Sequence, residues 1–141
     1  MKRSLIAVLT IAVLLLAFAG LAVAADNSEV AAERLFDLGF IEGYEDGSFR
    51  LDNNITRAEF AKVAVVAAGY ADAEKMLRQS STDFSDVGSG LWYTGWVNVA
   101  SSQGFVKGDP AGTFRPNDTI SAAEVVTVLL RVLGYNDNLP G

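Results

Sequence analysis

The chain has 141 residues, no cysteine, no histidine and a formal net charge of −6, and this length allows one modest domain or two very small repeats. Without histidine or cysteine, Ser-His and Cys-His nucleophilic systems, disulfides and the common zinc sites are excluded. The acidic balance argues against nucleic acid as a partner, because phosphate binding needs clustered Lys and Arg.

Residues 1–24 have the features of a secretory signal peptide. Two basic residues near the start precede an almost wholly apolar run at 5–16, and an Ala-x-Ala pattern ends at residue 24. We expect cleavage before Ala25 or one residue later, which would change the formal charge to −8 because both basic residues are removed. The alternative is an uncleaved membrane anchor. In either case the rest of the chain is exported, and nothing after Ala25 is long and apolar enough to span a bilayer.

The first half of the remaining chain predicts a helix, a loop and a second helix. Apolar residues at 29–38 recur with the spacing of one helical face, and Gly39 follows where a helix C-cap glycine belongs. Phe49 in the loop is predicted to be a core residue. A second helix is predicted to start at Thr56 and to end at Gly69, and a polar helical or linker segment follows at 71–82.

The same order of elements follows in the second half. A segment at 84–87 leads into a predicted helix at 92–103, a loop contains the predicted core residue Phe114, and a further helix is predicted at 121–134. Every element from residue 39 to 70 has a counterpart 65 positions later, and 12 of these 32 positions are identical. Such self-similarity indicates an internal repeat. We therefore predict an all-α fold of two helix-loop-helix repeats, with the first repeat and its linker at 25–82 and the second at 83–141.

Both second helices begin with a helix-capping motif. Thr56 and Glu59 have the spacing of a capping box, and Ser121 and Glu124 repeat it. The hydroxyl accepts a hydrogen bond from a backbone N–H of the first turn, and the carboxylate reaches back to the cap residue, for about 1 kcal/mol of helix stability. Helix capping thus accounts for these four residues, and they need no role in ligand binding.

Several of these segments together resemble the S-layer homology (SLH) repeat. The resemblance is carried by GYEDGSFR at 43–50, ITRAEF at 55–60, the Gly-Tyr pair at 69–70 and FSDV at 84–87, and it covers about 29–135. It implies helical repeats packed around a pseudo-threefold axis, of which two repeats form a partial arrangement. It also implies binding of secondary cell-wall polysaccharide, often with pyruvylated sugars, in grooves between repeats, to anchor S-layer subunits or exoenzymes.

The resemblance singles out Arg57 as the leading glycan-binding residue. The capping box accounts for its neighbours and leaves Arg57 without an evident local role, and an arginine can hold the carboxylate of a pyruvate ketal with two parallel hydrogen bonds. Ala122 replaces this arginine in the second repeat, so that repeat is expected to bind weakly or to be structural. Further candidates are Trp92, which could stack on a sugar face or pack in the core, and the basic residues Arg50, Arg115 and Lys107.

The sequence therefore predicts a secreted, non-enzymatic module of a bacterial cell wall or S-layer. No catalytic residue, metal site or cofactor is expected, and the spacing of an EF-hand calcium loop is not met. The expected partner is a secondary cell-wall polysaccharide. Two alternatives remain open: a tether to peptidoglycan or its attached polymer in a two-membrane envelope, and a protein–protein assembly module that associates with itself or with other SLH repeats.

Overall fold

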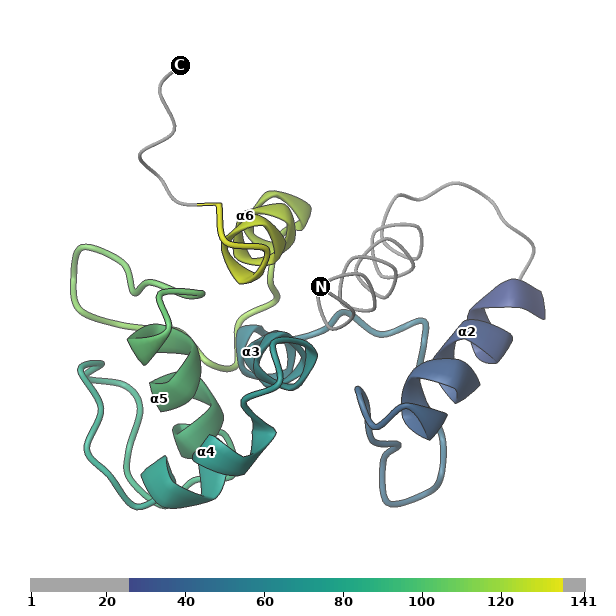
Figure 1. Cartoon of the computed structure of the whole chain (residues 1–141), viewed down its shortest axis with the longest axis horizontal. Coiled ribbons are helices and arrows are strands. Elements are labelled where there is room, and N and C mark those ends of the chain that lie inside the picture. The colour runs from purple at the N-terminus through teal and green to yellow at the C-terminus, as the bar shows by residue number, and fades with distance from the viewer. Residues whose placement is uncertain (1–25, 136–141) are drawn as a thin grey trace. The chain divides into compact units, whose positions relative to one another are not determined.

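A computed structural model describes residues 26–135 of the chain. The predicted signal peptide and its cleavage site lie outside the described residues, as does the segment 136–141. The described residues form helices and no strand (Figure 1). This confirms the predicted all-α fold class. The helices are α2 (Asp26–Asp37), α3 (Arg57–Ala67), α4 (Ala71–Leu77), α5 (Thr94–Ser102) and α6 (Ala122–Val132).

The chain divides into two compact units, and the division falls inside the predicted first repeat. Unit 1 comprises residues 1–54, described from residue 26, and unit 2 comprises residues 55–141, described up to residue 135. The second helix of the first repeat, α3, thus belongs to the same compact unit as the whole second repeat. A repeat in the sequence is not a self-contained packing unit here, because α3 buries its apolar side chains against helices of the next repeat.

The described part of unit 1 consists of α2 and the loop that follows it. The rings of Phe36 and Phe49 meet edge to face with centroids 5.8 Å apart, so Phe49 holds the loop against the helix while staying partly exposed. The helix ends as predicted at a glycine: Gly39 has a φ of +74°, and the N–H of Phe40 donates to the carbonyl of Leu35 at 2.9 Å. This is the usual way to satisfy the last carbonyls of a helix.

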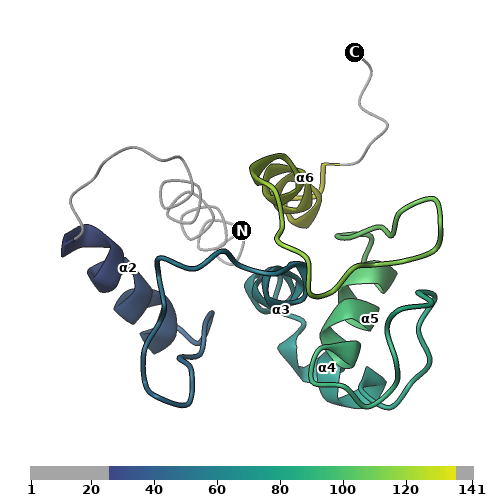
Figure 2. The ribbon, with the colours of Figure 1, turned by 180° about the vertical axis from the view of Figure 1, so that it is seen from behind.

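In unit 2, α3 lies between α5 and α6, as the two opposite views show (Figures 1 and 2). The core contains Phe60 and Val65 of α3, Val97 of α5 and Val125 of α6, each at most 1% exposed. The predicted core residue Phe114 is also 1% exposed, and its ring packs against Phe84 with centroids 5.4 Å apart. The loop of the second repeat is therefore pinned into the core by its aromatic residue.

The linker between the repeats contains the short helix α4, which packs on α5. Gly95 of α5 lies so close to Glu74 of α4 that an added Cβ would overlap the backbone carbonyl of Glu74. Glu74 itself is 1% exposed, and both of its carboxylate oxygens accept hydrogen bonds from Arg78, at 2.7 and 2.9 Å. The bidentate pair compensates the burial of the carboxylate.

No helix among residues 26–135 is both long enough and apolar enough to span a membrane.

Candidate functional site

Both predicted capping boxes form at the starts of α3 and α6. Oε2 of Glu59 accepts from the N–H of Thr56 at 2.7 Å, and the N–H of Glu59 donates to the Thr56 hydroxyl at 3.2 Å. The corresponding distances for Ser121 and Glu124 are 2.9 and 3.3 Å. The two helices therefore start in the same way, and each start presents its first turn in a fixed orientation.

These two helix starts are hydrogen-bonded to each other through the backbone. The N–H of Arg57 donates to the carbonyl of Asp118 at 2.9 Å, and the N–H of Ile120 donates to the carbonyl of Ile55 at 3.2 Å. A β-bridge between Thr56 and Thr119 lies between these bonds. Ile55 and Ile120 are equivalent positions of the two repeats, so equivalent segments meet at this point and carry the first residues of α3 and α6 with them.

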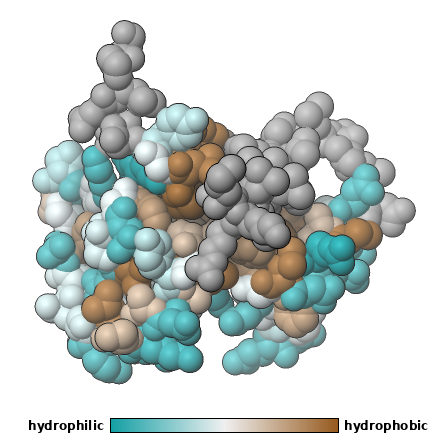
Figure 3. Space-filling view, viewed as in Figure 1, coloured by the Kyte–Doolittle hydropathy of each residue, from teal (hydrophilic) through white to brown (hydrophobic). Residues whose placement is uncertain are grey.

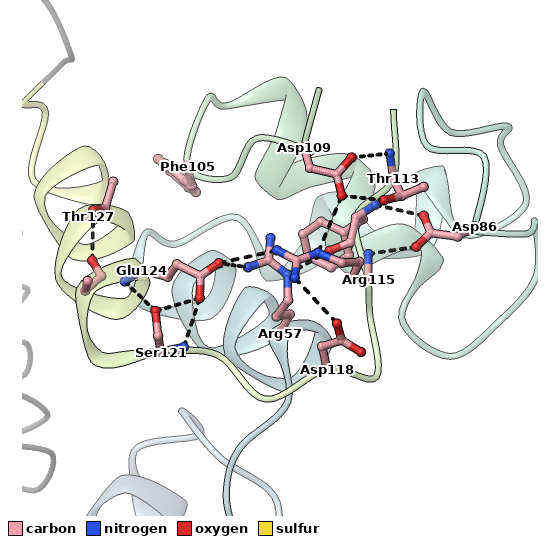
Figure 4. Close-up of polar contacts among 12 residues, drawn as sticks. Arg57, Asp86, Phe105, Asp109, Thr113, Arg115, Asp118, Ser121, Glu124 and Thr127 are labelled. Carbon is pink, nitrogen blue, oxygen red and sulfur yellow. Dashed lines mark hydrogen bonds and ion pairs between the residues drawn. The ribbon is translucent and has the colours of Figure 1, made fainter. Parts of the chain in front are cut away.

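Arg57 crosses this junction and is held by groups of the second repeat (Figure 4). Its Nε donates to the carbonyl of Phe114 at 2.7 Å, its Nη1 donates to Oε1 of Glu124, and its guanidinium carbon lies 5.0 Å from the centroid of the Phe114 ring. The residue is only 8% exposed. The sequence shows no local partner for Arg57, and the structure gives it partners that lie more than fifty residues away along the chain.

The carboxylate of Glu124 is shared between the helix cap and the arginine. Oε2 accepts from the N–H and the hydroxyl of Ser121, while Oε1 accepts from Arg57 and lies 3.8 Å from Nη2 of Arg115 (Figure 4). The hydrogen bonds from Ser121, followed by the charges of Arg57 and Arg115, hold the pKa of Glu124 below its usual value. This glutamate therefore stays ionised at neutral pH and neutralises part of the nearby positive charge.

A pocket of about 210 Å³ opens beside this pair, between α3, α6 and the segment that follows α5. Its charged lining consists of Arg57, Lys107, Arg131 and Glu124, three basic groups and one acidic group. The rest of its lining is mostly apolar: Phe60, Val106, Phe114, Ile120, Thr127 and Val128. In a chain with a net charge of −6, this is a local excess of positive charge next to an apolar surface.

Nη2 of Arg57 is the part of that guanidinium that is left for a ligand. Nε and Nη1 are used within the protein, and Nη2 makes no hydrogen bond or ion pair with a described residue. The described residues also contain no buried side-chain nitrogen or oxygen that lacks a hydrogen bond. Nη2 therefore has access to solvent, on an arginine whose position is fixed by its other two nitrogens.

Of the basic residues singled out in the sequence, Arg57 and Lys107 line the pocket and Arg115 lies beside it. Arg115 is engaged by carboxylates of its own loop, with Asp109 and Asp118 each 3.5 Å away. It occupies the left-handed region with a φ of +58°, a conformation that costs a non-glycine residue energy. The carboxylate of Asp86 stabilises this turn, because it accepts from the backbone N–H of Arg115 at 2.7 Å.

Trp92 does not line the pocket, and Arg50 belongs to unit 1. Trp92 is 53% exposed and packs edge to face on Tyr93, with centroids 5.3 Å apart. Nη2 of Arg50 lies 3.1 Å from Oδ2 of Asp46, and the guanidinium carbon of Arg50 lies 4.0 Å from the centroid of the Tyr44 ring. The pKa of Asp46 is lowered to about 2, chiefly by hydrogen bonds from Ser48 and then by Arg50.

Sequence reasoning missed Arg131, which lines the pocket from the last turn of α6. Its counterpart in the first repeat is Val66, so the comparison of repeats gave no reason to select it. The sequence signal that could have identified Arg131 is its spacing along the helix from Glu124 and Thr127. Glu124, Thr127 and Arg131 follow one another at three and four residues, which places them on one face of the helix.

Residues 31–61 and 83–126 match the family model of the S-layer homology domain. The chain is 41% identical over 115 residues to the Middle cell wall protein of Brevibacillus brevis, which covers 82% of this chain and 11% of that protein. It is 43% identical over 113 residues to the Surface layer protein of Brevibacillus choshinensis, covering 80% of this chain and 10% of that protein. A Cellulosome-anchoring protein of Acetivibrio thermocellus is 36% identical over 94 residues, or 67% of this chain and 21% of that protein. The chain thus spans about a tenth of the first two relatives. No solved structure gives a significant match.

Proposed function

The chain belongs to the S-layer homology family, and from this premise we propose that it is a non-covalent anchor that binds an anionic cell-wall glycan in the pocket between α3 and α6. The observation that carries the proposal is the gathering of Arg57, Lys107 and Arg131 around one partly apolar pocket of an acidic protein. The relatives whose names refer to surface layers, cell walls and anchoring support a location at the bacterial cell surface.

The ligand that suits this pocket is a sugar that carries a carboxylate, such as a pyruvylated unit of a secondary cell-wall polysaccharide. A carboxylate gains charge-assisted hydrogen bonds from guanidinium and ammonium groups. The apolar lining residues are buried and form the floor of the pocket, and the exposed Thr127 offers a hydroxyl group to a sugar at its wall. Binding of this kind involves no covalent chemistry, and we assign no catalytic role to the chain.

The three basic residues have different roles in this proposal. Arg57 is fixed by Phe114 and Glu124 and offers Nη2, so it contributes a preorganised donor. Lys107 is exposed at the rim and supplies charge, and Arg131 supplies a second guanidinium from α6. Arg115, Arg50 and Trp92 remain proposed glycan contacts that act outside the pocket, Arg115 being the nearest to it through Glu124.

We also propose that the chain consists of a leader at 1–24 and two repeats at 25–82 and 83–141. In this organisation the pocket is formed by both repeats, because Arg57 and Phe60 come from the first and the remaining lining residues come from the second. One repeat by itself would therefore lack part of the site.

The test is binding of the full chain, exported and purified from a bacterial host, to cell walls with and without their secondary polymer. Binding that requires the polymer and falls at least about tenfold, equivalent to 1.4 kcal/mol, in Arg131→Ala supports the proposal. Lys75→Ala, an exposed change on α4 outside the pocket, is the matched control. Equal binding to stripped walls would instead indicate peptidoglycan. Absence of binding by the folded protein would refute an anchoring role for the chain.

A further inference from the structure

Helix α6 is apolar on two sides, and only one of them faces the core of unit 2. Val125, Val128 and Leu129 are at most 5% exposed and face the core of unit 2. On the other side, Val126, Leu130 and Leu133 are 43, 44 and 37% exposed. These three, called the α6 stripe below, follow one another at four and three residues and share one face. Figure 3 shows the hydrophobic surface over this helix.

The internal repeat shows what covers the equivalent face elsewhere in the molecule. The counterparts of Val126 and Leu130 in α3 are Ala61 and Val65, and both are fully buried at 0% exposure. Helix α3 is packed against α5, the first helix of the following repeat, as well as against α6. The α6 stripe is thus the counterpart of residues that are buried in unit 2, where the first helix of the following repeat packs on α3 more extensively than α6 does.

Among the described helices, α2 is the counterpart of α5, and α5 is already packed on α3 and α4. The face of α5 that contains Gly95 lies against α4 of the preceding repeat. The equivalent residue in α2 is Val30, which is 62% exposed. Thus α2 has an exposed apolar residue where α5 makes its contact with the preceding repeat.

We propose that the α6 stripe binds α2 of a second copy of the chain, so that copies associate head to tail and continue the α3–α5 interface between molecules. Such an interface joins two different surfaces. Pairs and longer open assemblies leave one surface of each kind unused at their ends, whereas a closed ring uses all of them.

The charge distribution favours this pairing over a symmetric contact between two α2 helices. Helix α2 contains four acidic residues and one basic residue, and residues 26–54 carry a net charge of −6. Two such surfaces repel each other. Helix α6 has one acidic and one basic residue, Glu124 and Arg131, and residues 55–135 carry a net charge of only −1. Contact between α2 and α6 therefore avoids the repulsion between like charges.

Light scattering coupled to size-exclusion chromatography of the exported full chain tests the proposal. An apparent mass at least twice that of one chain, rising with concentration, is expected. Leu130→Glu is expected to weaken association at least tenfold, whereas Met76→Glu, the same type of change at an 82% exposed residue of α4, leaves it unchanged. A single-chain mass at every concentration, or equal association of Leu130→Glu and the parent chain, overturns the proposal. Leu130→Gln serves as a milder variant if the glutamate lowers the yield of folded protein.

A mixing experiment distinguishes the head-to-tail contact from a symmetric one. Val30→Glu and Leu130→Glu each lose one of the two surfaces, so each variant by itself is expected to be monomeric. Their mixture retains one intact pair of surfaces and is expected to form a heterodimer, which also shows that both variants are folded. Association of Val30→Glu by itself would indicate a contact between two α6 helices and would overturn the role of α2. A mixture that stays monomeric, while the parent chain associates, overturns the proposal as well.

Discussion

The guanidinium of Arg57 and the carboxylate of Glu124 come from equivalent helix starts of two repeats and form an ion pair across them. The second oxygen of the same carboxylate caps α6 through Ser121. One side chain thus fixes the start of a helix and holds the arginine of the preceding repeat. The interface between the repeats and the wall of the pocket are therefore built from the same atoms.

Arg57→Ala is expected to destabilise unit 2 by about 2 kcal/mol, because hydrogen bonds to charged groups typically contribute 1.5–3 kcal/mol. The change removes the buried bond to the carbonyl of Phe114 and the partner of Glu124. Arg57→Lys is expected to recover only part of this loss, since one ammonium cannot reproduce the two donors in their positions. Urea unfolding measures both values. Lys75→Ala is the surface control, and a loss from Arg57→Ala no larger than from this control would contradict the structural role.

The pKa of Glu124 is expected to rise in two variants, and by more in Ser121→Ala than in Arg57→Ala. The backbone N–H of Ser121 lowers that pKa most and is kept in both variants, the hydroxyl of Ser121 comes next, and the charge of Arg57 contributes less than the hydroxyl. Carbon-detected NMR titration of the carboxylate measures the order. A lower pKa of Glu124 in Arg57→Ala would contradict the ion pair.

The same lowered pKa gives the free energy of unfolding a defined pH dependence. Because the pKa of Glu124 lies below its value of 4.5 in the unfolded chain, the unfolded state binds more protons in the acidic range. The stabilisation is complete well above pH 4.5 and is lost as the pH falls through the folded-state pKa. Asp109, whose pKa is lowered by hydrogen bonds from Thr113, acts in the same direction. Melting temperatures that rise on acidification from pH 5 to pH 3 would contradict this prediction.

Gly95→Ala is expected to destabilise the chain by about 3 kcal/mol, at the upper end of ordinary overpacking costs. The new methyl group would overlap the backbone carbonyl of Glu74, so α4 and α5 must move apart. Gly88→Ala is the matched control, because its Cβ would meet only Leu91 Cδ1 at an ordinary 3.6 Å. Thermal unfolding compares the two variants, and equal melting temperatures would show that α4 is not packed on α5 as described.

The helices and their caps could be predicted from the sequence because their signals are local. A capping box needs only two residues three apart, as at Thr56 and Glu59, and the glycine after α2 ends that helix within one residue of the predicted position. The partners of Arg57 could not be predicted in this way. Glu124 is 67 residues away, and its contact with Arg57 depends on which helices pack together rather than on any local pattern.

The composition of the pocket shows the same division between local and long-range information. Lys107 is a candidate from the sequence because it adds positive charge beside the loop of the second repeat, whereas Arg131 has an apolar counterpart in the first repeat and was missed. Repeat comparison selects what two copies share. A site formed jointly by both copies uses residues that differ between them, so Arg57 and Arg131 each occur in one repeat only.

Reversal of charge at the pocket gives the most direct prediction for binding to cell walls. Arg131→Glu and Lys107→Glu are each expected to weaken binding at least tenfold, because an anionic ligand would meet an added negative charge. The partly buried Arg131 is expected to have the larger effect, since a charge pair away from solvent is screened less than one at the exposed Lys107. Lys75→Glu makes the same change of net charge on α4, outside the pocket. Sedimentation with purified walls, repeated at increasing NaCl concentration, measures the affinity, which is expected to fall with salt for the parent chain. If Lys75→Glu weakens binding as much as Arg131→Glu does, the effect reflects net charge alone, and the pocket is not the binding site.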